Sequence, residues 1–138
     1  MAVVKFKNGA IGTIEGTTNV YPKNLEETLY IFGENGTVKI GGTSTNNIDV
    51  WDFADETEED GKNKGLKEET SNVYGNGHMS LFADVIDAIQ SDRKPYVDAV
   101  AGRNALETVL SIYKSQKTGQ PVKLPLTDFA STDMKGEF

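Results

Sequence analysis

The residues with the clearest chemical potential form the run Gly75-Asn76-Gly77-His78-Met79-Ser80, directly before an amphipathic stretch. Glycines beside a helix start let a ligand approach the backbone, and the free amides there carry partial positive charge. The run also matches the opening of the G-x-G-x-x-G dinucleotide fingerprint. However, Ser80 stands where the third glycine belongs, and the flanking sequence lacks the strands of a β-α-β unit. We therefore expect an anion site here, not an NAD site.

His78 is the only histidine of the chain. Two interpretations of it stay open: a residue that caps or packs at the helix start, and a residue that donates or accepts a hydrogen bond with a ligand. A two-histidine metal site is excluded by the count alone.

Other catalytic chemistries have little support. The chain has no cysteine, which excludes disulfides, zinc-thiolate sites and iron–sulfur clusters. No serine lies in a nucleophile-elbow context. Asp84 and Asp87 lie off the apolar stripe of their helix, so we interpret them as a solvated face. The acidic run in residues 52–65 lacks the EF-hand spacing, so we expect a solvated loop and no metal site.

The composition narrows the class of partner. The chain has 138 residues, a formal net charge of -7 and 37% hydrophobic residues, without a long apolar run. One domain with one core fits this length. The negative charge disfavours nucleic acids and anionic membranes as partners, because both are bound through cationic side chains. We expect a soluble, cytoplasmic protein.

Two amphipathic helices must position the glycine-rich run. The first has one apolar stripe at helical spacing. The second starts after a capping Asp98 and stops at Thr118-Gly119. The two stripes consist of Leu81, Phe82, Val85, Ile86 and Ile89, and of Ala105, Leu106, Val109, Leu110 and Tyr113.

The first half of the chain is rich in strand signals. Asn8-Gly9 between apolar runs predicts a hairpin over residues 2–19, and a second hairpin follows over residues 25–40. Residues 48–53 form a further strand candidate, and residues 122–126 a short edge strand. We predict an α+β fold: a mostly antiparallel sheet of about five or six strands, with two C-terminal helices packed on one face. Its other face should meet water or another subunit.

The order of motifs resembles the C-terminal domain of the Gfo/Idh/MocA oxidoreductases. Within that family it is closest to the nucleotide-sugar 3-dehydrogenases that act on UDP-N-acetyl-glucosaminuronic acid. The resemblance covers nearly the whole chain. It rests on residues 19–28, 31–38, 72–78, 84–89 and 101–107, on Ile112-Tyr113-Lys114-Ser115, and on Thr118-Gly119 and Pro121-Val122.

The resemblance implies a two-domain enzyme whose N-terminal Rossmann domain binds NAD. Its C-terminal sheet shapes the sugar site and builds oligomers. This sequence lacks the family's Glu-Lys-Pro lysine and its Gly-Gly-x-x-x-Asp-x-Gly-x-His helix, while Arg93-Lys94-Pro95 is a connector. Strand-like alternation also begins at Val3 or Val4. We therefore expect a chain cut from a longer enzyme, with residues 1–126 as its C-terminal domain and 127–138 as a tail.

The functional expectation follows from the family. The parent would be an NAD-dependent dehydrogenase that oxidises the sugar 3-hydroxyl of a UDP-N-acetyl-hexuronic acid, and this fragment alone would be inactive and bind no NAD. The expected substrate-binding residues are Asn72, Tyr74, Asn76, His78, Tyr21 and Lys23. Homo-oligomers would form through the open sheet face. Alternatives are a stand-alone oligomerisation or sugar-binding module, or a family member that acts on another sugar or a cyclitol.

Overall fold

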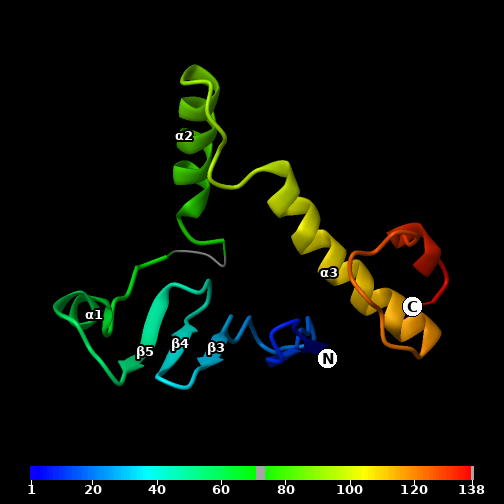
Figure 1. Ribbon diagram of the computed structural model, residues 1–138, viewed down its shortest axis with the longest axis horizontal. Coiled ribbons are helices and arrows are strands. Elements are labelled where there is room, and N and C mark those ends of the chain that lie inside the picture. The colour runs from blue at the N-terminus through cyan, green and yellow to red at the C-terminus, as the bar shows by residue number, and fades with distance from the viewer. Residues whose placement is uncertain (71–73, 138) are drawn as a thin grey trace. The chain divides into compact units, whose positions relative to one another are not determined.

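The computed structural model describes residues 1–70 and 74–137. The chain forms two compact units. The terminal unit consists of Met1–Glu15 and Ala83–Phe138, and the central unit of Gly16–Phe82. Figure 1 shows the elements in chain order. They are β1 (Ala2–Lys5), β2 (Ile11–Ile14), β3 (Leu29–Phe32), β4 (Gly36–Gly41), β5 (Asn47–Phe53), α1 (Glu58–Asn63), α2 (Gly77–Gln90), α3 (Ala99–Thr118) and the short 3-10 helix η1 (Ser131–Met134).

In the terminal unit, β1 and β2 form the antiparallel hairpin that the Asn8-Gly9 pair predicts. Gly9 has a φ of 94°, a conformation that glycine adopts without strain, and the Asn8 side chain accepts the Ala10 N–H at 3.1 Å. The second strand ends at Ile14, earlier than expected.

In the central unit, β3, β4 and β5 form an antiparallel sheet in that order (Figure 1). The second predicted hairpin and the fifth strand are thereby confirmed. Ile31, Val38 and Trp51 are aligned across the three strands, and Val38 is only 8% exposed.

The sheet of the central unit has two different faces, because successive side chains of a strand alternate between them. The face that α1 contacts, which we call the covered face, carries the aligned Ile31, Val38 and Trp51. Val38 is buried there, whereas Ile31 on the edge strand β3 is 51% exposed. The open face carries Tyr30 and Phe32, whose rings stack with centroids 6.1 Å apart and whose exposed fractions are 51% and 78%. Lys39 Nζ lies 5.5 Å from the centre of the Tyr30 ring.

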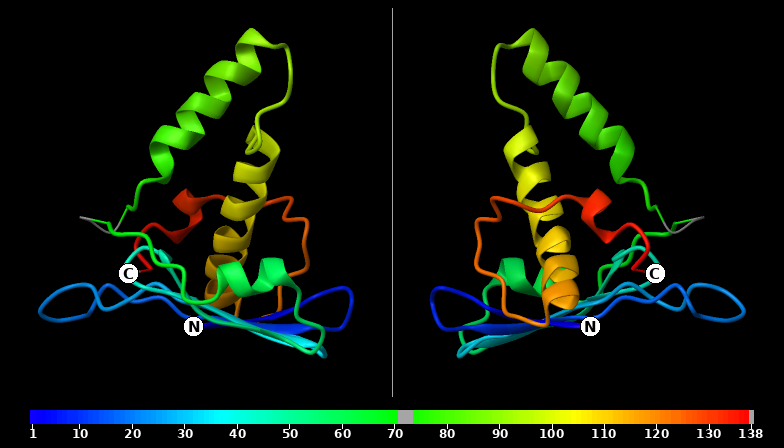
Figure 2. Two further views of the ribbon diagram at one scale, coloured as in Figure 1. Left: turned by 90° about the vertical axis from the view of Figure 1, so that its left-hand side faces the viewer. Right: turned by 90° about the vertical axis from the view of Figure 1, so that its right-hand side faces the viewer.

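A helix occupies part of the acidic run that we expected to be a solvated loop. Thr57 caps α1, and Asp60 closes a capping box by accepting the Thr57 N–H at 2.8 Å. Asp60 also accepts Trp51 Nε1–H at 3.0 Å, so α1 is attached to the covered face (Figure 2). Hydrogen bonds from Thr57 and from Trp51 hold the pKa of Asp60 below its ordinary value. The run is thus ordered by a local cap and one contact with the sheet.

Both predicted long helices are confirmed, and α3 has the predicted ends. Asp98 accepts the Ala101 N–H at 2.9 Å, and Gly119 ends α3 with a φ of 65° and a bond to the Ser115 carbonyl at 2.9 Å. Along the stripe of α2, Phe82 is 60% and Ile89 77% exposed. The packing of both helices on one sheet face stays a prediction.

The predicted α+β class, the antiparallel pairing and a count of five strands are confirmed, but the prediction of a single sheet with an edge strand at residues 122–126 is wrong. Five strands form two antiparallel sheets in the described residues. Residues 122–126 form no strand. Pro125 has no amide N–H to donate to a neighbouring strand. The Leu126 N–H already donates to Glu107 Oε1 of α3 at 2.8 Å, so it is not available for a strand hydrogen bond either. Beyond this segment, Met134 of η1 is 4% exposed.

The connection between α2 and α3 is held by carboxylates that we interpreted as a solvated face. Arg93 forms ion pairs with Asp84 at 2.8 Å and with Asp87 at 2.5 Å. Asp84 also accepts the Tyr96 N–H at 2.7 Å. This backbone bond, followed by the Arg93 guanidinium, holds the pKa of Asp84 below its ordinary value.

We predict a pH dependence for this connection. A carboxylate with a lowered folded-state pKa stabilises the fold above its unfolded pKa, about 3.9, and loses that contribution as pH falls through the folded value. The Tyr96 amide resonance should therefore titrate with a midpoint below that of an ordinary aspartate. Asp84→Asn keeps an acceptor for the Tyr96 N–H and should abolish the transition. A midpoint at or above the ordinary value would contradict the assignment.

Candidate functional site

Three of the six predicted site residues lie together at the start of α2. The rings of Tyr74 and His78 meet edge to face, with centroids 6.4 Å apart, and Asn76 lies between them in the chain. Tyr74 is 75% exposed, and His78 and Asn76 are exposed as well. Asn72 lies outside the described residues. We call Tyr74–His78 the α2 approach.

Tyr21 and Lys23 lie elsewhere in the central unit, on the loop between β2 and β3. Tyr21 is 95% exposed. Lys23 is exposed as well. The structure thus places three of the six predicted residues at the start of α2 and these two on the loop between β2 and β3.

The turn between β4 and β5, residues 42–46, supports the α2 approach. Gly42 has a φ of 94°, and a Cβ atom there would lie 2.3 Å from Asn46 Oδ1. That Asn46 oxygen accepts the Ser44 N–H at 3.2 Å and the Ser44 hydroxyl at 3.3 Å. Gly75 also approaches this turn, since a Cβ atom on it would be 3.6 Å from Ser44 Oγ. The close approach of Asn46 therefore requires glycine at position 42, whereas Gly75 lies at ordinary contact distance from Ser44.

Residues 66–70 connect this turn to the α2 approach. Asn46 Nδ2 donates to the Glu68 carbonyl at 2.6 Å, and the Glu68 N–H donates to the Asn46 carbonyl at 2.9 Å. The Glu68 carboxylate in turn accepts from Asn76 Nδ2 at 2.8 Å. The Thr70 and Ser44 hydroxyls lie 3.2 Å apart, within hydrogen-bond distance. A chain of hydrogen bonds therefore runs from the β4–β5 turn to Asn76.

The sequence did not predict Ser44, Asn46 or Glu68 as part of the site. A weak signal was present, because a run of short polar residues after Gly41-Gly42 is typical of turns in which side chains bond to nearby backbone groups. Glu68 has no such signal. Its role depends on a partner eight positions away and on the folding of the intervening turn.

The arrangement offers groups that can bind a ligand. The α2 approach offers two rings, a side-chain amide and the free amides of a helix start. No group of three or more metal-ligating side chains occurs among the described residues. A dinucleotide does not fit this helix start either, because every strand pair in the described chain is antiparallel and α2 belongs to no β-α-β unit.

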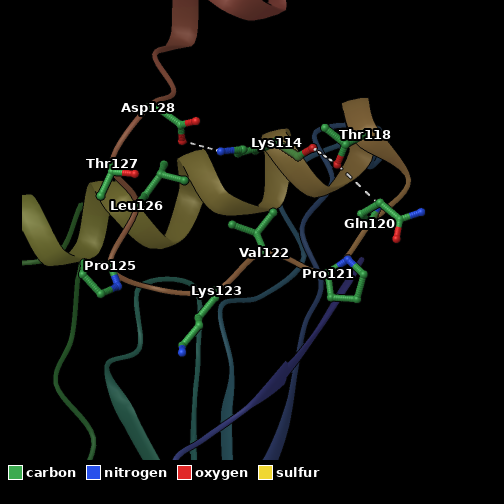
Figure 3. Close-up of a pocket in the computed structure, with 10 residues that line it drawn as sticks. All are labelled: Lys114, Thr118, Gln120, Pro121, Val122, Lys123, Pro125, Leu126, Thr127 and Asp128. Carbon is green, nitrogen blue, oxygen red and sulfur yellow. Dashed lines mark hydrogen bonds and ion pairs between the residues drawn. The ribbon is translucent and has the colours of Figure 1, made fainter.

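A separate pocket lies in the terminal unit and contains none of the predicted site residues. It has a volume of about 350 Å³ and lies between the end of α3 and residues 120–128 (Figure 3). Lys114 and Asp128 form an ion pair at its wall. The rest of the wall combines two prolines, Val122 and Leu126 with polar side chains and the second lysine, Lys123. Because the pocket contains none of the predicted residues, we assign the candidate site to the α2 approach.

Comparison with protein families gives one match over most of the chain. Residues 1–124 match the model of the Gfo/Idh/MocA oxidoreductase family, C-terminal alpha/beta domain. The chain belongs to this family. The resemblance noted from the sequence motifs is thereby confirmed.

Solved structures of family dehydrogenases are similar to this Gfo/Idh/MocA domain. The WlbA dehydrogenase from Bordetella pertussis, solved with NADH and UDP-GlcNAcA, is 38% identical with a TM-score of 0.82. The WlbA dehydrogenase from Chromobacterium violaceum, solved with the same two ligands, is 32% identical with a TM-score of 0.76. Both alignments cover 91% of this chain, but only 36% and 34% of the respective dehydrogenase chains. This chain thus spans about a third of each.

No curated protein sequence gives a significant match.

Among the described residues of this Gfo/Idh/MocA domain, no helix has the length and apolar character needed to cross a membrane.

Proposed function

We propose that this chain is the substrate-binding and oligomerisation domain of an NAD-dependent nucleotide-sugar dehydrogenase. The proposed parent reaction is oxidation of the sugar 3-hydroxyl of a UDP-N-acetyl-hexuronic acid, in the cytoplasm. The observation that carries the proposal is the likeness over 91% of the chain to a dehydrogenase solved with NADH and UDP-GlcNAcA. In this proposal residues 1–126 form the domain, residues 127–138 form a tail, and a Rossmann domain belongs to another part of the parent.

The α2 approach would contact the sugar end of the substrate. An aromatic ring such as that of Tyr74 offers an apolar surface with a polar tip, and the polar atoms of Asn76 and His78 can bond to sugar hydroxyls. Tyr21 and Lys23 would extend the site, with the Lys23 ammonium suited to a phosphate or carboxylate. Such contacts accelerate a reaction by holding the substrate in a productive orientation.

NAD would bind to the parent outside these residues, since the α2 start does not fit a dinucleotide. The chain would therefore orient the sugar and take no part in hydride transfer. We expect the isolated chain to be inactive.

Two measurements on the purified chain test this proposal. With NAD and UDP-GlcNAcA, NADH should not rise above background. In an NMR titration, UDP-GlcNAcA should shift the resonances of Tyr74, Asn76 and His78, whereas UDP, the matched ligand without the sugar, should shift them less. Production of NADH would refute the assignment as an inactive domain, and unchanged resonances at saturating UDP-GlcNAcA would refute the substrate role.

The open face of the central sheet favours a second, compatible function in assembly. α1 is attached to the opposite face, whereas Tyr30 and Phe32 form an exposed aromatic pair. Large aromatic residues are enriched at subunit contacts, and a symmetric dimer needs one self-complementary patch. We propose that a second copy of the chain occupies this face.

A further inference from the structure

Asn76 is held by two acceptors of the central unit. Its Nδ2 group donates to Glu68 Oε1 at 2.8 Å and to the Glu69 carbonyl at 3.3 Å. These two bonds use both hydrogens of the amide nitrogen. Within the side-chain amide of Asn76, only the oxygen is left for a ligand.

The chemistry of the partners fixes the orientation of this amide. An ionised carboxylate and a backbone carbonyl can only accept hydrogen bonds. Rotating the amide by half a turn would place its oxygen against two acceptor oxygens, which is electrostatically unfavourable. The nitrogen therefore faces Glu68 and Glu69.

We infer that Asn76 recognises a hydrogen-bond donor of the sugar, a hydroxyl or the acetamido N–H, and that Glu68 is the positioning residue that imposes this preference. The inference rests on the proposed function, because it takes the α2 approach as the sugar site. It also excludes a role: Asn76 does not donate to the carboxylate or the phosphates of the substrate, since these groups only accept hydrogen bonds.

Glu68 is itself held in place. Its N–H and carbonyl groups form the reciprocal pair of bonds with Asn46, at 2.9 and 2.6 Å. Beside it, Ile48 N–H bonds to the Leu66 carbonyl at 2.8 Å, so the segment follows the first residues of β5. The carboxylate thus projects from backbone that is bonded to the sheet, and an anchored acceptor restricts Asn76 more than a mobile one.

Three variants test the inference in NMR titrations with UDP-GlcNAcA. Asn76→Ala removes the acceptor and should raise the Kd about tenfold, which is the loss expected for one hydrogen bond to a ligand. Glu68→Ala frees the amide and should raise the Kd by a similar factor. Glu68→Gln is the matched control, because its side-chain oxygen can still accept from Asn76 Nδ2, and its Kd should stay within about twofold of the unmodified chain.

The side-chain amide signals of Asn76 give an independent reading without ligand. They should move toward those of a solvated asparagine in Glu68→Ala and stay in place in Glu68→Gln. If the unmodified chain binds UDP-GlcNAcA and both alanine variants bind it equally well, the inference is overturned while the proposed function stands. If the unmodified chain does not respond to UDP-GlcNAcA, the proposed function fails, and the inference fails with it.

Discussion

Replacing Gly36 by alanine is expected to destabilise the central unit by about 1–3 kcal/mol, the usual cost of overfilling a packed position. A Cβ atom on Gly36 would lie 2.3 Å from Cδ1 of Phe53 and 2.9 Å from the Asp52 carbonyl oxygen. The ring of Phe53 can rotate, but the backbone of β5 cannot move without disturbing the ladder that pairs it with β4. The strain therefore falls on the sheet itself.

Trp51 offers the measurement for this prediction. It is the only tryptophan of the chain and it lies in β5, so its fluorescence in a urea titration reports the unfolding of the central sheet. The midpoint should fall for Gly36→Ala.

Gly61→Ala is the matched control. Gly61 lies inside α1 of the same unit, and nothing lies within 4 Å of a Cβ atom placed there. Alanine should stabilise this helix by about 0.5–1 kcal/mol, because it loses less backbone freedom on folding than glycine. An unchanged midpoint for Gly36→Ala, with Gly61→Ala stabilising as expected, would show that β5 tolerates the extra atom.

Phe32→Asp is expected to weaken self-association by about 100-fold or more, since it would bury an unpaired charge in the proposed contact. Phe32 is 78% exposed, so the change should leave the fold of a single chain nearly unaffected. Light scattering at micromolar concentration should report a dimer or larger species for the unmodified chain and a monomer for the variant.

The control for association is Tyr96→Asp, a change of the same kind in the terminal unit at a residue that is 93% exposed. It should leave the association state unchanged. A strictly monomeric unmodified chain would remove the assembly function. Equal dissociation by both variants would show that net charge, and not the open face, controls association.

The site was predicted less completely than the elements that carry it. The glycine-rich run drew attention to His78, and the family resemblance added Tyr74 and Asn76; the structure places these three at the start of α2. It could not reveal that the Asn76 amide is already engaged, because Glu68 is one of many exposed acidic residues when read in sequence alone. Tyr21 and Lys23 followed only from family resemblance, and they lie on the loop between β2 and β3.

Local signals account for what the sequence by itself determined. Asp98 and Gly119 set the ends of α3, and Asn8-Gly9 set the first hairpin, because caps and tight turns depend on groups within a few residues of one another. The same kind of signal was available at Thr57, where a capping box starts α1 inside an acidic run. The capping box was not recognised from the sequence, because the many acidic residues around it favoured a solvated loop.

Tertiary structure decided the features that join distant positions. Asn46 and Glu68 are 22 residues apart, and Leu126 is 19 residues from the glutamate that takes its N–H. Such pairs form only after the intervening chain has folded, so no short-range pattern of residue types specifies them. The sequence therefore defined most of the strands and the two long helices, while bonds from the β4–β5 turn through Glu68 to the α2 approach fixed the orientation of the Asn76 side-chain amide.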